Sequence, residues 1–341
     1  AMTGCTTPGN ALLSFEALEE GGAVGVLGFR AADPHPYGRM VVNDDGTLHR
    51  IVEAKDADPE EFAIDLCSSG MMALDGKCAF DMLAEIDNDN AQGEYYLPDV
   101  VRVAHGHDRF CTVVEGPEAE LLGINSRAEL ARAEARLQRT MRDDAMAGGA
   151  TLIQPETVFF SYDTTLGQDV LIEPNVVFGP GVEIADNVTI RAFSYLEQAT
   201  VESGAVVGPY ARLRPGARIG AGARVGNFVE IKNADLGAGA KANHLSYVGD
   251  AHVGAGANIG AGTITCNYDG FDKYETNIGT GAFIGSNSAL VAPVTIGDGA
   301  IVAAGSTISA DVADDVLAIE RAEQVTKTGW AARFRKLKKK S

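Results

Sequence analysis

The chain has 341 residues, of which 45% are hydrophobic and 7% aromatic, a composition typical of a globular protein with two or three domains. Its net charge of −19 argues against general nucleic-acid binding, which needs a basic surface. Its apolar runs fall short of the ~20 residues that a membrane-spanning helix needs. With no secretory leader recognisable at the start, we expect a cytoplasmic protein with neither nucleic acid nor membrane as a partner.

The N-terminal part, residues 1–125, shows the mixed pattern of an α/β domain. Residues 23–29 form an apolar, β-rich run of the kind that is buried on both faces of a sheet. Asn43-Asp44-Asp45-Gly46 predicts a hairpin between strands at 39–42 and 49–52. Further elements are expected as helices at 14–20, 80–86 and 97–104 and as strands at 70–74 and 111–114. His105 and His107 are expected on one face of a strand, where they are structural residues.

A helix is predicted over residues 126–146, within a linker spanning 126–149. Ser126 and Glu129 fit a capping box, in which each side chain satisfies a free backbone N–H group of the other residue. Gly148-Gly149 ends the helix.

Residues 150–341 are dominated by a six-residue period. Aliphatic or aromatic residues recur at 172, 178, 184, 190 and 196, at 207, 213, 219, 225 and 231, and from 278 to 308. Glycine and asparagine occupy many of the intervening positions, where tight corners are needed. This is the hexapeptide pattern of a parallel β-helix, a three-sided prism in which three six-residue rungs make one coil. The period breaks at 235–253 and at 267–277, so we expect the prism to be interrupted at both places, with the second break a protruding loop.

One polar stretch, Asn227 to Asn277, stands out from the repeat. His244 is the candidate general base, because an imidazole takes up and returns a proton near neutral pH. Glu230 and Asn267 are candidates to orient it, and Tyr247 to donate a further hydrogen bond. Three cations suit a phosphate group: Arg214, Lys232 and Lys273. His252 is the only other histidine here, so a metalloenzyme is disfavoured, and the five scattered cysteines form no metal motif and are expected to be reduced.

Three motifs, RLRPGA (212–217), NHLSYVGD (243–250) and GAGTITCNYDG (260–270), together resemble the acetyltransferase domain of the bacterial bifunctional N-acetylglucosamine-1-phosphate uridyltransferase/glucosamine-1-phosphate N-acetyltransferase family. The resemblance implies a left-handed parallel β-helix that forms a homotrimer. It implies acetyl transfer from acetyl-CoA to glucosamine 1-phosphate, with His244 as the base. It places the sugar phosphate on Arg214, Lys232, Tyr247, Asn258 and Lys273, and the acetyl-CoA and acceptor site on Ala261, Asn267, Tyr268, Ser286, Ala304 and Arg321.

The N-terminal part resembles only the later portion of the family's Rossmann-like nucleotidyltransferase domain. The motifs PYGRMV, IVEAKDA and NAQGEYYLPDVV carry this resemblance, as does GINSRAEL. Gly38, Glu53 and Asn125 fall on positions that contact UDP-N-acetylglucosamine, Asn125 also on a Mg²⁺ ligand, and Ser68 replaces the family's usual asparagine. The glycine-rich UTP-phosphate loop is missing. We therefore expect an N-terminally truncated chain without uridyltransferase activity, although its intact parent uses UTP.

Two other functions stay open at this point. One is a non-catalytic trimeric scaffold, against which the density of polar residues in the 227–277 stretch argues. The other is a hexapeptide acyltransferase with a different acceptor, although Arg214 and Lys232 favour a phosphorylated one. The basic tail from Gly329 onward is either a solvated end or a contact for an anionic ligand or a neighbouring subunit.

Overall fold

The computed structural model describes residues 18, 22–34, 36–90, 92–121 and 123–339. It divides into two compact units, Ala1–Arg136 and Leu137–Ser341, with the boundary inside one helix. The division of the chain by function at residues 125 and 149 remains a prediction. Of the helix expected at 14–20, the structure describes only Leu18, which is helical.

The first unit is built on a five-stranded sheet of order β3-β2-β4-β1-β5. Strand β1 (Val24–Arg30) lies inside the sheet and is, as predicted, almost wholly buried. It pairs in parallel with β5 (Cys111–Glu115) and antiparallel with β4 (Leu66–Leu74). The hairpin is confirmed as β2 (Arg39–Val42) and β3 (Leu48–Val52). The sheet is therefore mixed, and β1 and β5 are the only parallel neighbours among its described strands.

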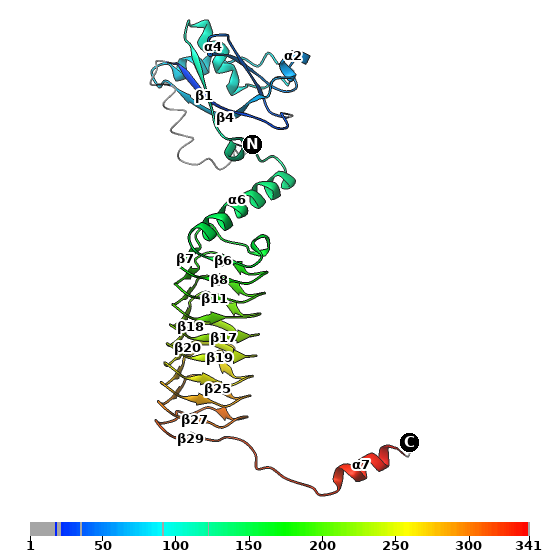
Figure 1. Cartoon of the computed structure of the whole chain (residues 1–341), viewed down its shortest axis with the longest axis vertical. Helices are drawn as coiled ribbons and strands as arrows, with labels where there is room; N and C mark the ends of the chain where they lie inside the picture. The colour runs from blue at the N-terminus through cyan, green and yellow to red at the C-terminus, as the bar shows by residue number, and fades with distance from the viewer. Residues whose placement is uncertain (1–17, 19–21, 35, 91, 122, 340–341) are drawn as a thin grey trace. The chain divides into compact units, whose positions relative to one another are not determined.

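Short helices accompany this sheet (Figure 1). They are α2 (Pro59–Phe62), α3 (Ala79–Ala84), a 3₁₀ turn η1 (Leu97–Asp99) that runs into α4 (Val100–Gly106), and α5 (Glu118–Leu121). The prediction of a strand for the two histidines is wrong, because His105 lies in the last turn of α4 and His107 is its C-cap. Each has a structural partner: His105 contacts the carbonyl oxygen of Leu48 at 2.7 Å, and His107 contacts Glu85 at 2.9 Å.

The predicted long helix is α6 (Arg127–Ala147). At its start Ser126 Oγ accepts a hydrogen bond from the Glu129 N–H, while Glu129 accepts one from the Asn125 N–H. Its last turns belong to the second unit. There Gln138 is buried and exchanges two hydrogen bonds with the backbone of Phe160, at 2.6 and 2.9 Å.

The second unit is a parallel β-helix, which confirms the predicted fold class (Figure 1). One face carries β6 (Thr151–Leu152), β8 (Leu171–Ile172), β11 (Thr189–Ile190), β14 (Val206–Val207), β17 (Arg224–Asn227), β19 (Lys241–His244), β21 (Asn258–Ile259), β24 (Phe283–Ile284), β27 (Ile301–Val302) and β29 (Leu317–Ala318). A 3₁₀ turn, η2 (Pro155–Thr157), lies beside the first coil.

The other two faces are joined because two long strands bend from one to the other. These are β18 (Glu230–Leu236), which pairs with both β15 and β16, and β20 (Tyr247–Val253), which pairs with both β22 and β23. The second face carries β9 (Val177–Phe178), β12 (Tyr195–Leu196), β15 (Arg212–Leu213), β22 (Ile264–Cys266), β25 (Ala289–Val291) and β28 (Thr307–Ile308); the third carries β7 (Thr165–Leu166), β10 (Glu183–Ile184), β13 (Ala199–Val201), β16 (Ala217–Ile219), β23 (Thr276–Ile278) and β26 (Val294–Ile296).

The residues of the six-residue period fill the prism. Ile172, Phe178, Ile190, Leu213 and Ile231 are all at most 1% exposed. The first break in the period does not interrupt the prism, contrary to the prediction. Leu236 follows Ile231 by five residues instead of six, and both are buried, so the coil is only one residue shorter. The second break is a loop, as predicted, and it leaves the prism after β22.

Candidate functional site

The polar stretch is organised by two columns of residues that run along the prism, one at each edge of the second face. The first column contains His244 and occupies the corner between the first and second faces. The second contains Asp250 and occupies the corner between the second and third faces. Between them lie the starts of β18 and β20, which carry Glu230, Lys232 and Tyr247.

His244 ends β19 and is exposed to solvent. Its Nδ1 lies 2.7 Å from the side-chain oxygen of Asn227, the residue at the same position one coil earlier. An amide oxygen only accepts hydrogen bonds, so Nδ1 donates, and Nε2 is left with its lone pair available. This is the tautomer that a general base requires. The sequence-based candidates for orienting His244, Glu230 and Asn267, have other partners, so that part of the prediction is wrong.

Backbone hydrogen bonds continue the His244 column toward the C-terminus. The N–H of Gly262 donates to His244 O, that of Asn287 to Ala261 O, and that of Gly305 to Ser286 O. Three residues expected to contact acetyl-CoA therefore stack below the base, one per coil: Ala261, Ser286 and Ala304. Arg321 closes the column, since its guanidinium donates to Ala304 O at 2.6 Å. Sequence position alone did not reveal this alignment.

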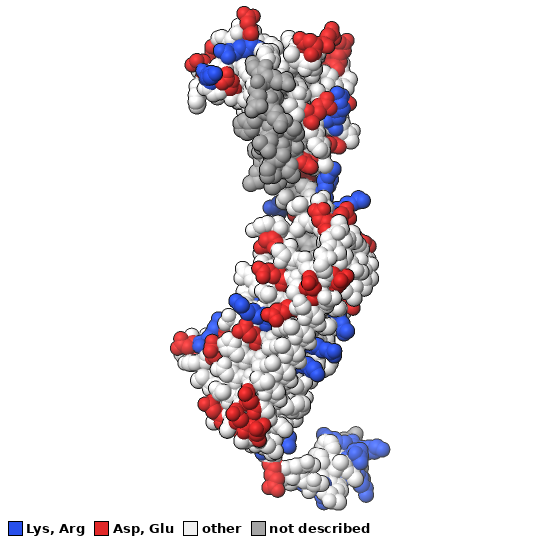
Figure 2. All heavy atoms as spheres, turned by 60° about the vertical axis from the view of Figure 1, so that its left-hand side comes forward, with Lys and Arg blue, Asp and Glu red and all other residues white. Residues whose placement is uncertain are grey.

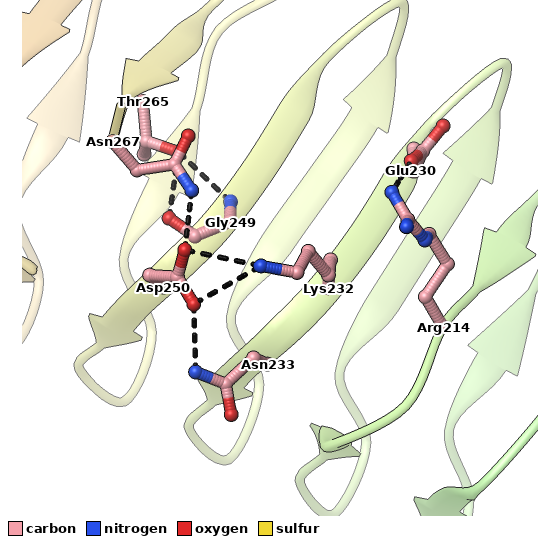
Figure 3. Close-up of polar contacts among 8 residues, drawn as sticks. All are labelled: Arg214, Glu230, Lys232, Asn233, Gly249, Asp250, Thr265 and Asn267. Atoms are coloured by element: carbon pink, nitrogen blue, oxygen red, sulfur yellow. Dashed lines mark hydrogen bonds and ion pairs between the residues drawn. The ribbon is translucent and has the colours of Figure 1, made fainter. Parts of the chain in front are cut away.

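Lys232 and Asp250 form the most buried ion pair of the β-helix among the described residues, with Nζ 3.2 Å from Oδ2 (Figure 3). Burial, the largest single influence, lowers the pKa of the Lys232 ammonium, but its hydrogen bonds and the negative charge of Asp250 together outweigh burial and raise the pKa overall. Burial likewise raises the pKa of the Asp250 carboxyl, and hydrogen bonds from Asn233, Asn267 and Lys232 outweigh it, so this pKa is lowered. Both groups are therefore charged at neutral pH.

Arg214 follows β15 and donates to Glu230 at 2.8 Å, separately from the Asp250 cluster (Figure 3). Both side chains are about one third exposed, at 37% and 33%. Glu230 therefore supports the cation Arg214 and not the base. The Tyr247 ring lies against Gly249, where a Cβ atom would come within 2.4 Å of the phenol oxygen.

The protruding loop starts at Asn267, which is buried and donates to Asp250. The loop is closed at its base, because the Tyr274 N–H donates to Asn267 O at 2.9 Å. Tyr268 and Lys273 face each other across it as an antiparallel bridge, and both are exposed. Asn258 lies elsewhere, on the first face beside Lys241, so a single chain does not bring it next to Lys232.

Two residues that sequence reasoning missed complete the site: Asn227, which orients His244, and Asp250, which joins Lys232 to Asn267. The signal for both was their spacing, because each lies one coil from its partner. A hollow of about 670 Å³ lies on the third face and is lined by Arg218, Asp235 and His252 among others. None of the predicted site residues lines it, and His252 there pairs with Asp235 at 3.0 Å.

In the first unit, three of the four nucleotide-sugar positions converge. The Ser68 N–H donates to Gly38 O at 2.9 Å, and a Cβ at Gly38 would lie 3.5 Å from the Glu53 carboxylate. Burial raises the pKa of this carboxyl. Asn125 lies near Gly123. The described residues contain no group of three His, Cys, Asp or Glu side chains that could hold a metal, so Asn125 alone does not build a Mg²⁺ site.

Charge is unevenly distributed over the surface. Acidic side chains gather at several places along the β-helix, whereas the C-terminal helix α7 (Trp330–Lys338) carries basic ones (Figure 2). The four described cysteines, Cys67, Cys78, Cys111 and Cys266, are free thiols. No helix in the described part of the chain is long and apolar enough to cross a membrane.

Comparison with known proteins places this geometry in context. Residues 163–198, 198–233 and 275–310 match the family model "Bacterial transferase hexapeptide (six repeats)". The chain is 58% identical to the bifunctional protein GlmU of Sphingopyxis alaskensis over 95% of its length and 72% of that protein. It is also 58% identical to GlmU of Paramagnetospirillum magneticum, over 92% of the chain and 70% of that protein. GlmU of Zymomonas mobilis is 54% identical, over 97% and 73%.

Proposed function

The chain belongs to the family of bifunctional GlmU proteins, and from this premise we propose that its β-helix transfers the acetyl group of acetyl-CoA to the amine of glucosamine 1-phosphate. The observation that carries the proposal is the 2.7 Å contact between His244 Nδ1 and Asn227 Oδ1, which favours a lone pair on Nε2 in a residue at the head of the Ala261–Ser286–Ala304 column. An acetyltransferase needs such a base next to the thioester.

The chemistry requires one proton transfer and one exchange of bonds. The amine attacks the thioester carbonyl, the new C–N bond forms, and the C–S bond breaks to release CoA. His244 Nε2 takes the proton that the amine loses, and that proton is then available to the departing thiolate. Lys232 and Arg214 hold the acceptor's phosphate, with Lys273 and Tyr268 reaching over it from the loop and Tyr247 lining it. The column below His244 holds acetyl-CoA, and Asn258 contributes from the first face.

A homotrimer is part of this proposal, because Asn258 and Lys232 do not meet within one chain. An exposed aromatic stack supports it. Phe193, Tyr210 and Phe228 stack along the corner that leads to His244, with ring centroids 4.9 and 5.1 Å apart. Each is about half exposed and has a positive φ, a backbone state that costs a non-glycine residue roughly 1 kcal/mol. A neighbouring subunit that covers this stack would bury a large apolar surface.

The assay follows thiol release from acetyl-CoA in the presence of glucosamine 1-phosphate. We expect His244→Ala to lower kcat by roughly 10²–10⁴-fold, while His252→Ala, outside the site, leaves it unchanged. Equal turnover of the two variants would remove His244 as the base. Equal efficiency with unphosphorylated glucosamine would favour the second candidate, an acyltransferase with another acceptor, and no turnover at all would favour the scaffold.

Two further measurements complete the proposal. Sedimentation of Phe228→Ser against the wild type tests the trimer, which we expect to weaken in the variant.

The second measurement concerns uridyltransferase activity, the other activity of the family. The nucleotide-sugar positions Gly38, Glu53 and Ser68 are present, but these 341 residues do not include the UTP-phosphate loop. We expect the polypeptide of these residues to release no pyrophosphate from UTP, and release would contradict this. The cytoplasm is the proposed location.

A further inference from the structure

We propose that Asp250 is a positioning residue of the acceptor site, which fixes the Lys232 ammonium and the start of the protruding loop relative to each other. This inference rests on the proposed function, since it concerns how the same site recognises a phosphorylated acceptor. Asp250 acts through its neighbours and is not a catalytic residue.

The placement of Asp250 follows from the coil register. Lys232 pairs with Gly249, and Tyr247 pairs with Ile264, so Asn233, Asp250 and Asn267 occupy the same corner position in three successive coils. Asp250 is thus the central member of an amide–carboxylate–amide column (Figure 3). Asn233 and Asp250 have φ values of 44° and 45°, the left-handed region in which Asn and Asp are the most tolerated side chains after glycine.

Three donor side chains form hydrogen bonds with the Asp250 carboxylate. Asn233 Nδ2 lies 2.7 Å from Oδ1, Lys232 Nζ lies 3.2 Å from Oδ2, and Asn267 Nδ2 donates to Oδ2. A carboxylate is the side chain that only accepts, with two oxygens and about four lone pairs. Asn233 and Asn267 could turn their amide oxygens toward an amide at this position, but the Lys232 ammonium has only donors. Lys232 is therefore the neighbour that favours Asp at 250 for its charge and not only for its size.

The backbone beside Asp250 is held in the same way. Thr265 Oγ1 accepts from the Gly249 N–H at 2.8 Å and also contacts Gly249 O at 3.0 Å, which ties β20 to β22 next to the carboxylate. Asp250 itself is 7% exposed and Asn267 is equally buried. Because the loop with Tyr268 and Lys273 begins at Asn267, the carboxylate connects that loop to Lys232 on the coil two turns away.

Two consequences follow for an anionic acceptor. The carboxylate keeps Lys232 protonated and fixes the position of its Nζ. Lys232 is therefore pre-organised as a phosphate-binding cation. The ammonium has three N–H donors, so it can hold Asp250 and still donate to a phosphate. Asp250 also sets the distance between Lys232 and the loop that closes over the acceptor.

The experiment compares Asp250→Asn with the matched control Asp235→Asn, an exposed carboxylate on the third face that pairs with Arg218 and His252. Both variants remove one charge by the same chemical change. We expect Asp250→Asn to raise KM for glucosamine 1-phosphate roughly tenfold, the loss of one hydrogen bond to a charged group. The kcat value and KM for acetyl-CoA are expected to change much less, and Asp235→Asn to change nothing.

A double-mutant cycle separates positioning from general destabilisation. In a Lys232→Met background the effect of Asp250→Asn on KM is expected to shrink below twofold, because the carboxylate then has no ammonium to position. Effects that multiply in the double variant would overturn the proposal, as would a KM of Asp250→Asn equal to that of the wild type.

If Asp250→Asn does not fold, Asn233→Gly serves instead: it retains the left-handed backbone and removes one donor. A several-fold rise in KM for glucosamine 1-phosphate is then expected, and an unchanged KM would overturn the proposal. A wild type without acetyl transfer would refute the proposed function itself.

Discussion

His244 Nδ1 and Asn227 Oδ1 lie 2.7 Å apart on two neighbouring coils of the β-helix, and this contact sets which nitrogen of the imidazole is free. Removing the acceptor lets the ring rotate and lets the proton occupy either nitrogen. We expect Asn227→Ala to lower kcat about tenfold, less than the roughly 10²–10⁴-fold attributed to a general base itself.

The same measurement distinguishes orientation from folding. Asn227→Asp keeps an acceptor at the same place, so it should retain more activity than Asn227→Ala. Melting temperatures of both variants are expected to lie near that of the wild type, since Asn227 is only partly buried. If the two variants lose activity equally, the orienting role is refuted.

Gly249→Ala tests the position of the Tyr247 ring. A Cβ at Gly249 would meet the phenol oxygen at 2.4 Å, and the backbone there has no positive φ, so the substitution changes space and not backbone freedom. The ring must move, and we expect KM for glucosamine 1-phosphate to rise several-fold. Gly76→Ala is the control, because a Cβ there has no neighbour within 4 Å. An unchanged KM in Gly249→Ala would show that Tyr247 does not contact the acceptor.

The stability that Asp250 provides should depend on pH. Hydrogen bonds lower its pKa in the folded state, so its contribution is present above the unfolded value of about 3.9 and is lost as the pH falls through the folded value. We expect Asp250→Asn to lower the melting temperature at pH 7, and the difference from the wild type to shrink toward pH 3. Thermal melts at a series of pH values measure this. A difference that stays constant with pH would mean that the carboxylate's charge adds no stability.

Cys111 should be inert to alkylating reagents in the folded protein. It is fully buried in strand β5, and burial raises the pKa of its thiol to about 11. The thiolate is the reactive form, so labelling is expected only on unfolding or above that pH. Peptide mapping by mass spectrometry after iodoacetamide treatment at pH 8 gives the answer, with Cys266, which is partly exposed, as the internal comparison. Rapid labelling of Cys111 would show that the sheet of the first unit opens.

The fold of the second unit was predictable because its six-residue period holds over most of its length. One buried residue every six positions specifies a rung, and Ile172, Leu213 and Ile231 occupy the interior as expected. The five-residue step before Leu236 was misinterpreted as an interruption, since a shortened corner and a break look alike in one dimension. The mixed sheet of the first unit was less predictable, because an apolar run such as β1 does not reveal the direction of its neighbours.

The site was predictable in its members and less so in its partnerships. His244, Lys232 and Arg214 carry chemistry that stands out in a repeat of small residues. Their partners, Asn227 and Asp250, are ordinary polar residues. Their importance comes from lying one coil away from His244 and Lys232, respectively. Once the length of a coil is known, such pairs can be found by counting, but the five-residue steps change that length locally.

The hydrogen bond between the Tyr274 N–H and Asn267 O has a consequence for how this site can diversify. The chain leaves the prism and returns to it at nearly the same point, so the loop between these residues can lengthen, shorten or change sequence without moving a single rung. The coils above and below keep their register whatever the loop contains. Acceptor choice can therefore vary on this loop while the base and its column stay fixed, and grafting a loop of different length between Asn267 and Tyr274 should preserve the fold.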